Sequence, residues 1–117
     1  MRAMRALGVA LGWVIVATII WLSVTPAPID IGVKAGDKLG HLGAYAWVMF
    51  WFAQVYHRLR TRLAYGIGFV AMGVALEFVQ LGLGYRTFEV MDMVADALGV
   101  ISGWGLAILL DPMLRPR

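Results

Sequence analysis

The stretch LAYGIGFVAMGVALEFVQLGL, residues 63–83, decides the fold of this chain, and Glu77 is its only charged residue. An α-helix needs about 20 predominantly apolar residues to cross the hydrocarbon core of a bilayer. The stretch is long enough to do so. It therefore predicts a transmembrane helix with one acidic side chain inside the membrane.

Three further apolar stretches approach the same length. They cover about residues 7–24, 39–56 and 90–110. The segments between them are short, and Pro26 and Pro28 interrupt the helical pattern after the first stretch. The sequence predicts an all-α membrane protein in which residues 1–117 form one domain, a bundle of four transmembrane helices.

The overall composition supports a membrane protein. The chain is 62% hydrophobic and 15% charged, with a mean hydropathy of +0.80, whereas soluble domains carry about 25% charged residues. Its net charge is +3, but the arginines do not alternate with aromatic residues as in a nucleic-acid platform. We expect no nucleic-acid partner. The absence of cysteine excludes a thiol nucleophile and a cysteine-based metal site.

The basic residues predict the orientation of the four helices. Cytoplasmic loops of membrane proteins carry an excess of Lys and Arg. Seven of the ten basic residues fall on one side of the predicted membrane: Arg2, Arg5, Arg58, Arg60, Arg62, Arg115 and Arg117. Both termini are therefore predicted to be cytoplasmic. The first apolar stretch is longer than a signal-peptide core and lacks a cleavage site, so we expect it to remain as a helix.

Polar residues gather at the outer ends of the predicted helices. With a rise of about 1.5 Å per residue, Tyr45, Glu77 and Asp96 each lie about 9 Å below the outer surface. The same estimate places a shallower layer of His41, Gln80 and Asp92 about 3–5 Å deep. Three separate helices thus deliver polar side chains to the same two layers, which predicts a common site.

The cost of an acid in lipid predicts that these side chains face the bundle interior. An acid at the centre of a membrane helix costs about 2.5–3.5 kcal/mol, and such residues usually mark functional sites. Asp92, Asp96, Gly99 and Gly103 lie on one helical stripe. Small residues four apart allow a close helix neighbour. The polar face and the packing face of this helix are therefore expected to coincide.

Other interpretations of these residues remain open. A network of structural polar contacts would also hold helices together. A metal site is another alternative, because His41, Glu77, Asp92 and Asp96 offer one imidazole and three carboxylates. No H-E-x-x-H spacing supports it, so we predict neither a metal nor another cofactor. The aromatic residues of 47–56 are interpreted as lipid-facing or interfacial packing.

The ordered motifs resemble those of the VanZ-like family of small bacterial membrane proteins. DKLGHLGAY resembles the family's D-K-x-x-H-x-x-x-Y, EFVQ its E-x-x-Q, and RTFEVMDMVADALGVISG its R followed by D-x-x-x-N-x-x-G-x-x-x-G. The resemblance covers about residues 37–103. Asp96 stands where the family usually has Asn. The matched polar positions, which we expect to bind a ligand, are Asp37, Lys38, His41, Tyr45, Glu77, Gln80, Arg86, Asp92 and Asp96.

The resemblance implies a multi-pass protein of the bacterial inner membrane. The family's namesake is associated with resistance to the glycopeptide teicoplanin. The implied function is therefore glycopeptide resistance or the handling of lipid-linked envelope precursors, with membrane lipids, such a precursor or a lipoglycopeptide as partners. One alternative is a membrane enzyme with Glu77, His41 and Asp92 as candidate catalytic groups. A structural subunit of a larger complex is another, and self-association remains open.

Overall fold

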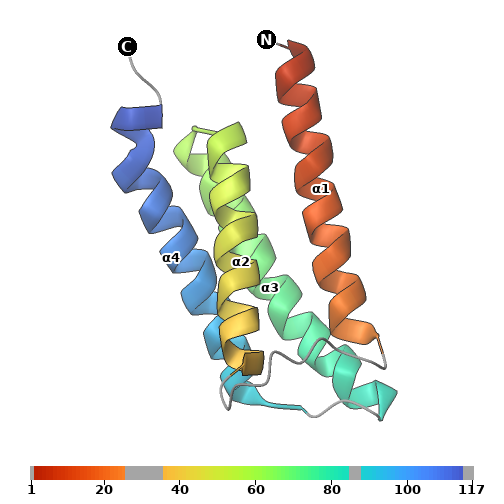
Figure 1. Cartoon of the computed structure of the whole chain (residues 1–117). Coiled ribbons are helices and arrows are strands. Elements are labelled where there is room, and N and C mark those ends of the chain that lie inside the picture. Colours follow the sequence, from red (N-terminus) through yellow and green to blue (C-terminus); the bar gives the residue numbers. More distant parts are fainter. Residues whose placement is uncertain (1, 26–35, 85–87, 115–117) are drawn as a thin grey trace.

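The protein is a bundle of four α-helices that run alternately up and down (Figure 1). The computed structural model describes residues 2–25, 36–84 and 88–114. The helices are α1 (Arg2–Val24), α2 (Gly36–Val55), α3 (Leu59–Leu83) and α4 (Val90–Leu114). The start of α1 and the end of α4 lie at the same end of the bundle (Figure 1). We call this the arginine end, because Arg2, Arg5, Arg58, Arg60 and Arg62 lie there.

Three of the helices are long and apolar enough to cross a membrane, namely α1, α3 and α4. The fourth, α2, has 20 residues and runs beside them (Figure 1). It is more polar because Asp37, Lys38 and His41 occupy its first two turns. It also packs against each of the other three helices, so much of its surface faces protein. The chain is therefore a multi-pass membrane protein with a more polar helix at its centre.

The helices extend beyond the apolar stretches seen in the sequence. Helix α1 begins at Arg2 rather than near residue 7, and α3 begins at Leu59 rather than 63. Arginine is a good helix former, so the basic flanks continue the helices beyond the apolar stretches. Helix α4 runs through Pro112 to Leu114. Proline removes one backbone hydrogen bond there, close to the end of the helix.

Two glycines of α4 allow its close packing on α2. A Cβ atom at Gly99 would lie 2.5 Å from the carbonyl oxygen of Leu42, and one at Gly103 would overlap the carbonyl oxygen of Ala46. The backbones of α2 and α4 therefore touch directly. This contact is the most extensive between any two helices of the bundle. Gly84 ends α3 with a φ of 81°, a conformation that glycine adopts without strain.

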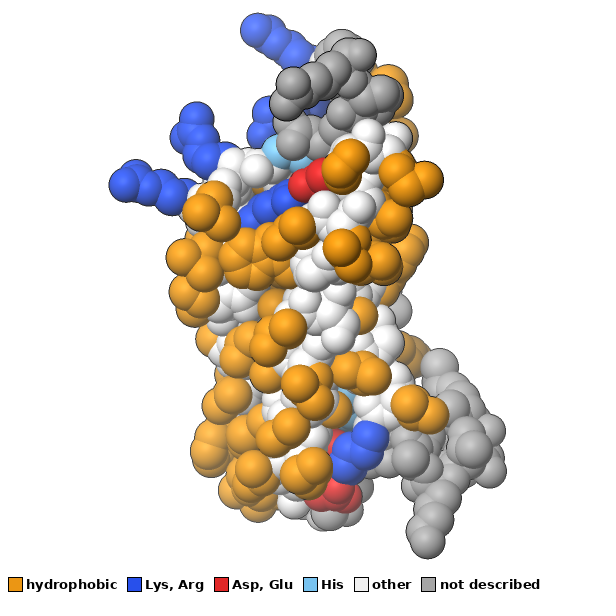
Figure 2. All heavy atoms as spheres, turned by 90° about the vertical axis from the view of Figure 1, so that its left-hand side faces the viewer, with side chains coloured by type: hydrophobic (Ala, Val, Ile, Leu, Met, Phe, Trp, Pro, Cys, Tyr) orange, Lys and Arg blue, Asp and Glu red, His pale blue; other side chains and the backbone are white. Residues whose placement is uncertain are grey.

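The surface of the bundle is more apolar than parts of its interior. Figure 2 shows a broad hydrophobic belt between two ends that both carry charged side chains, most of them basic at one end. Leu109 is 75% exposed, whereas Glu77 and Asp96 are each 1% exposed. This arrangement suits lipid as the solvent of the belt. The interpretation of the aromatic residues of 47–56 as lipid-facing is wrong for Phe52, which is buried and stacks on Tyr65.

Candidate functional site

The polar residues of three helices meet at the end of the bundle opposite the arginine end. Helix α2 contributes Lys38 and His41, α3 contributes Glu77, and α4 contributes Asp92 and Asp96. Glu89 lies just before α4 and joins them. We call these six residues the polar cluster. Its carboxylates on Glu77, Asp92 and Asp96 are all buried, so neighbouring groups rather than water surround them.

Lys38 forms the outer layer of the polar cluster. Its ammonium group pairs with the carboxylate of Glu89 and lies 2.7 Å from Oδ1 of Asp92. The side chain of Lys38 is 28% exposed and that of Glu89 is 41% exposed, whereas that of Asp92 is 8% exposed. This layer is therefore open to water and links the start of α2 to the start of α4.

His41 lies one turn deeper and is held by Asp96. Its Nδ1 lies 2.7 Å from Oδ1 of Asp96, so Nδ1–H donates to that carboxylate when the ring carries its proton there. Its Nε2 is 3.8 Å from Oδ2 of Asp92. Gly73 of α3 makes room for Asp96, because a Cβ atom at Gly73 would lie 2.5 Å from Oδ2 of Asp96. Asp96 therefore fixes the direction in which the imidazole points.

Glu77 is the buried centre of the polar cluster. Its Oε2 accepts a hydrogen bond of 2.9 Å from the backbone N–H of Glu89. Its Oε1 is buried and receives no hydrogen bond from any described residue. One ligand atom each of His41, Glu77 and Asp92 lies within 4.8 Å of the others. The carboxyl group of Glu77 thus faces another acid and an imidazole.

The charges of the polar cluster do not balance among its own six residues. Its four carboxylates face one lysine and one histidine, which leaves a net charge of −2 with His41 protonated and −3 with His41 neutral. Isolated charge in a low-dielectric interior is costly. Carboxylates that lie this close together must share a proton or face a cation. The polar cluster can accordingly bind protons, cations or hydrogen-bond donors.

The remaining predicted site residues have different positions. Tyr45 is buried on α2, with Asp96 and Glu77 as its charged neighbours. Gln80 is also buried, but its amide donates to the carbonyl oxygen of Ser23 on α1, at 2.7 Å. It connects α3 to α1. Arg86 and the side chain of Asp37 lie outside the described residues.

A second polar network lies at the arginine end, and the sequence analysis missed it. The side chain of Arg62 is 5% exposed and donates to the carbonyl oxygens of Ala53 and Tyr56. Its guanidinium also binds both carboxylate oxygens of Asp111, at 3.0 and 3.1 Å. Arg62 therefore joins the ends of α2 and α4 to the start of α3. The signal in the sequence was Asp111, an acid at the end of an apolar stretch on the same side as Arg62.

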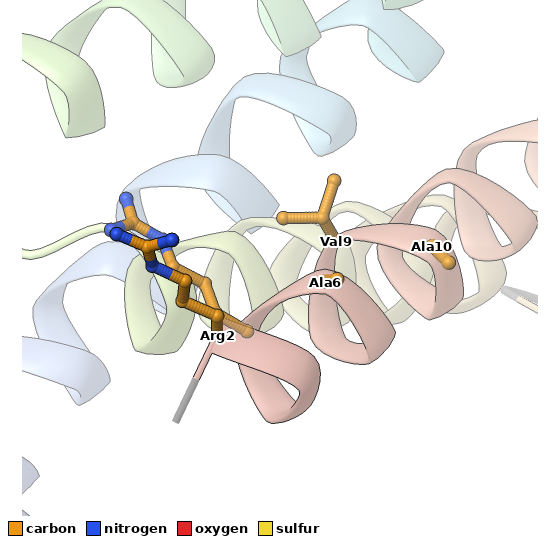
Figure 3. A pocket seen from close by; sticks show the side chains of 5 residues that line it. Arg2, Ala6, Val9 and Ala10 are labelled. Atoms are coloured by element: carbon orange, nitrogen blue, oxygen red, sulfur yellow. The ribbon is translucent and has the colours of Figure 1, made fainter.

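A hollow at the start of α1 lacks the chemistry of the polar cluster. It has a volume of about 440 Å³ and is lined by Arg2, Arg5, Ala6, Val9 and Ala10. Figure 3 shows two arginine side chains beside small apolar ones along one face of the helix. It contains no acid, histidine or hydroxyl group. The polar cluster is therefore the stronger candidate for a functional site.

Comparisons with known proteins agree with the fold and the motifs. The VanZ/LLP1 family model matches residues 9–111. The chain is also similar to the "Uncharacterized protein C11E3.10" of Schizosaccharomyces pombe, with 33% identity over 100 residues. That match covers 83% of this chain and 57% of the fungal protein, so the chain spans little more than half the length of that relative. No solved structure matches.

The family match covers the whole polar cluster and most of the bundle. It includes Lys38, His41, Glu77, Asp92 and Asp96, and it includes the glycines that bring α2 and α4 together. The length of this match and the four-helix architecture together establish the family of the chain. The chain belongs to the VanZ/LLP1 family of membrane proteins.

Proposed function

We propose that the polar cluster binds the headgroup of a lipid or of a lipid-linked molecule at the outer leaflet of a membrane. All four helices cross that membrane, with the arginine end in the cytoplasm. The observation that carries the proposal is the convergence of buried Glu77, Asp92 and Asp96 with Lys38 and His41 at one end of an apolar bundle. Groups of this kind inside a membrane usually serve function rather than stability.

The layering of the polar cluster suits a headgroup. Lys38 and Glu89 form a half-buried outer pair that water reaches, so its opening costs less than that of a fully buried ion pair. A phosphate or carboxylate can replace Glu89 on Lys38 through charge-assisted hydrogen bonds. Amino or hydroxyl groups of the same headgroup can then donate to the buried carboxylates. The exposed hydrophobic belt would hold the acyl chains alongside.

The resemblance to the VanZ-like family narrows this proposal. A lipid-linked envelope precursor, or a glycopeptide that carries an acyl chain such as teicoplanin, has the required combination of polar head and apolar tail. In this form the protein lies in the bacterial inner membrane and contributes to glycopeptide resistance. The relative described above is fungal, so a headgroup common to many membranes is the broader form of the proposal.

Lipid mass spectrometry on the purified protein tests the proposal. Wild type should retain one lipid class above the composition of the host membrane. Lys38→Met and Glu77→Gln should lose that class, because each removes a charge of the polar cluster. Arg60→Met is the control, since Arg60 is exposed at the arginine end. Equal lipid profiles in all four proteins, or no enrichment in folded wild type, would contradict the proposal.

Growth assays test the narrower form. Expression of the wild-type chain in a teicoplanin-susceptible bacterium should raise the inhibitory concentration of teicoplanin, and Glu77→Gln should abolish the increase at equal protein level. Unchanged susceptibility with a well-expressed wild-type chain would remove the link to glycopeptides. The broader headgroup site would still be tested by lipid mass spectrometry.

The orientation of His41 favours an enzyme as a second candidate. Asp96 holds Nδ1, so Nε2 points toward Asp92 and Glu77. A base oriented by a third group is a common catalytic arrangement. His41 and Glu77 would then exchange protons with a bound lipid substrate, with Asp92 beside them. Incubation of the purified protein with lipid extract should yield a new product with wild type and none with His41→Gln. A product formed equally by both proteins would contradict this candidate.

A further inference from the structure

We propose that His41, Glu77 and Asp92 form a binding site for a divalent transition-metal ion and that Asp96 orients His41 for it. The proposal concerns the same part of the molecule as the headgroup site, but it rests on the geometry of these side chains alone. The sequence alone predicts no metal here, because His41, Glu77, Asp92 and Asp96 show no metal-binding spacing such as H-E-x-x-H.

Each of the three residues has one ligand atom that faces a partner outside the group of three. Nδ1 of His41 is engaged by Asp96, Oε2 of Glu77 by the N–H of Glu89, and Oδ1 of Asp92 by Lys38. Among the described residues, Oε1 of Glu77 is buried without a hydrogen-bond partner, and so is Oδ1 of Asp92 despite its ion pair with Lys38. Nε2 of His41 and Oδ2 of Asp92 lie 3.8 Å apart, too far for a hydrogen bond. Two ligands of a tetrahedral zinc ion lie about 3.4 Å apart, from bond lengths near 2.0–2.1 Å.

Glu77 supplies the independent observation that a ligand is missing from this group. Its side chain is 1% exposed, and Oε1 has no hydrogen-bond donor among the described residues. Buried carboxylate oxygens are normally satisfied, and an exception calls for an explanation. The acid that Glu77 faces, Asp92, is itself an acceptor when ionised. A cation between the two acids satisfies both.

The charge of the site also fits a divalent ion. Glu77 and Asp92 carry two negative charges, and a neutral His41 adds none, so a divalent ion balances the three ligands. Metal-bound histidines commonly donate their second N–H to a carboxylate, which fixes the ring. Asp96 is that carboxylate here. One imidazole with two carboxylates suits zinc or manganese, and zinc binds such sites more tightly.

The site has a route for the ion and an open coordination position. The side chain of His41 is 23% exposed, and the outer pair of Lys38 and Glu89 is partly in water. Three protein ligands leave a fourth position for water or for an anionic oxygen of another molecule. A bound ion would add its positive charge to that of Lys38 for the binding of a phosphate headgroup.

Zinc titration of the lipid-free protein in detergent tests the proposal separately from the headgroup site. The protein should carry no affinity tag that binds metal and should first be stripped with a chelator. We expect one zinc ion per chain by calorimetry, with a rise in the thermal unfolding midpoint. His41→Gln and Glu77→Gln should weaken binding by at least about 100-fold, and Asp96→Asn by about 10–100-fold.

The chain offers a matched control, because its other histidine is His57, at the arginine end. His57→Gln should change zinc affinity by less than about twofold. The loss of a zinc ligand or of its supporting partner would instead weaken binding by about 10–100-fold or more. X-ray absorption of the zinc-loaded wild type should show nitrogen and oxygen ligands near 2.0–2.1 Å with one imidazole, and this readout needs no variant to fold.

Two results would overturn the metal site. One is a folded wild-type protein that binds no zinc at concentrations up to about 1 mM, a binding free energy of about −4 kcal/mol; a proton shared by Glu77 and Asp92 would then satisfy these acids. The other is zinc binding that His57→Gln abolishes and His41→Gln preserves. Lipid retention without zinc binding would refute the metal site and support the headgroup site. Zinc binding without lipid retention would support the metal site and refute the headgroup site.

Discussion

Replacement of Arg62 by methionine should destabilise the bundle more than any other single change at the arginine end. Methionine keeps most of the volume of the side chain and removes its charge and its donors. Arg62 is buried and donates to Asp111, Ala53 and Tyr56. The substitution removes the Arg62 partner of the buried end of Asp111 and leaves the carbonyl oxygens of Ala53 and Tyr56 without the donors of Arg62.

The magnitude follows from these contacts. Removing one partner of a buried ion pair costs about 3–5 kcal/mol. The side chain of Asp111 is 23% exposed, so water at the end of the bundle recovers part of that cost. We expect a loss of about 2–4 kcal/mol, which corresponds to a fall of about 10 °C or more in the unfolding midpoint by the scaling for small domains.

Thermal unfolding in detergent, followed by tryptophan fluorescence, measures this loss. Arg60→Met is the matched control, because Arg60 is exposed two residues away, and it should stay near wild type. The double variant Arg62→Met with Asp111→Leu should recover part of the stability, since it also removes the carboxylate that Arg62 binds. An unfolding midpoint of Arg62→Met within about 2 °C of Arg60→Met, less than 1 kcal/mol by the same scaling, would refute the assigned role of Arg62.

Two further predictions concern packing and topology. Gly99→Leu and Gly103→Leu should disrupt the bundle, because their side chains would collide with the backbone of α2. Gly105→Leu is the control, since Gly105 has open space around it. Equal unfolding midpoints for all three variants would contradict the close contact of α2 and α4. The chain has no cysteine, so single cysteines at the exposed positions Leu39 and Leu59 can be labelled with an impermeant maleimide in intact cells, and only Leu39→Cys should react. Labelling of both from outside would contradict the predicted orientation.

The sequence predicted the architecture because its dominant signal is local. Four apolar stretches predict four helices, of which α1, α3 and α4 are long and apolar enough to span a membrane, and short connections favour antiparallel successive helices. The stripe of Asp92, Asp96, Gly99 and Gly103 correctly placed the polar and packing faces of α4 together. Helix depth alone brought Glu77, His41 and Asp92 to one end of the bundle, where the structure has them.

The details that the sequence did not predict depend on contacts between distant helices. Gln80 is rotated by about 60° from Glu77 around α3, and this small angle directs its amide to α1 rather than into the polar cluster. The burial of Arg62 depends on Asp111, which lies 49 residues away. Residue spacing within one helix contains no information on either contact. The central position of α2 likewise follows from its packing against the other three helices. The polarity of the α2 sequence is only a weak indication of that position.

The unfolding midpoint of Glu77→Gln, measured together with ligand retention, tests most directly whether the polar cluster is a site for a ligand. The variant keeps the shape of the side chain and removes one of four clustered negative charges. If the cluster is a ligand site, the unfolding midpoint of the variant in the presence of a chelator should be unchanged or higher than that of wild type, because repulsion between the acids falls and the new amide can donate to Asp92. In separate measurements without chelator, the variant should lose lipid retention and zinc binding. A midpoint lower by more than about 5 °C, roughly 1 kcal/mol, with lipid and zinc retained by the remaining folded protein would show that the cluster is a structural network instead.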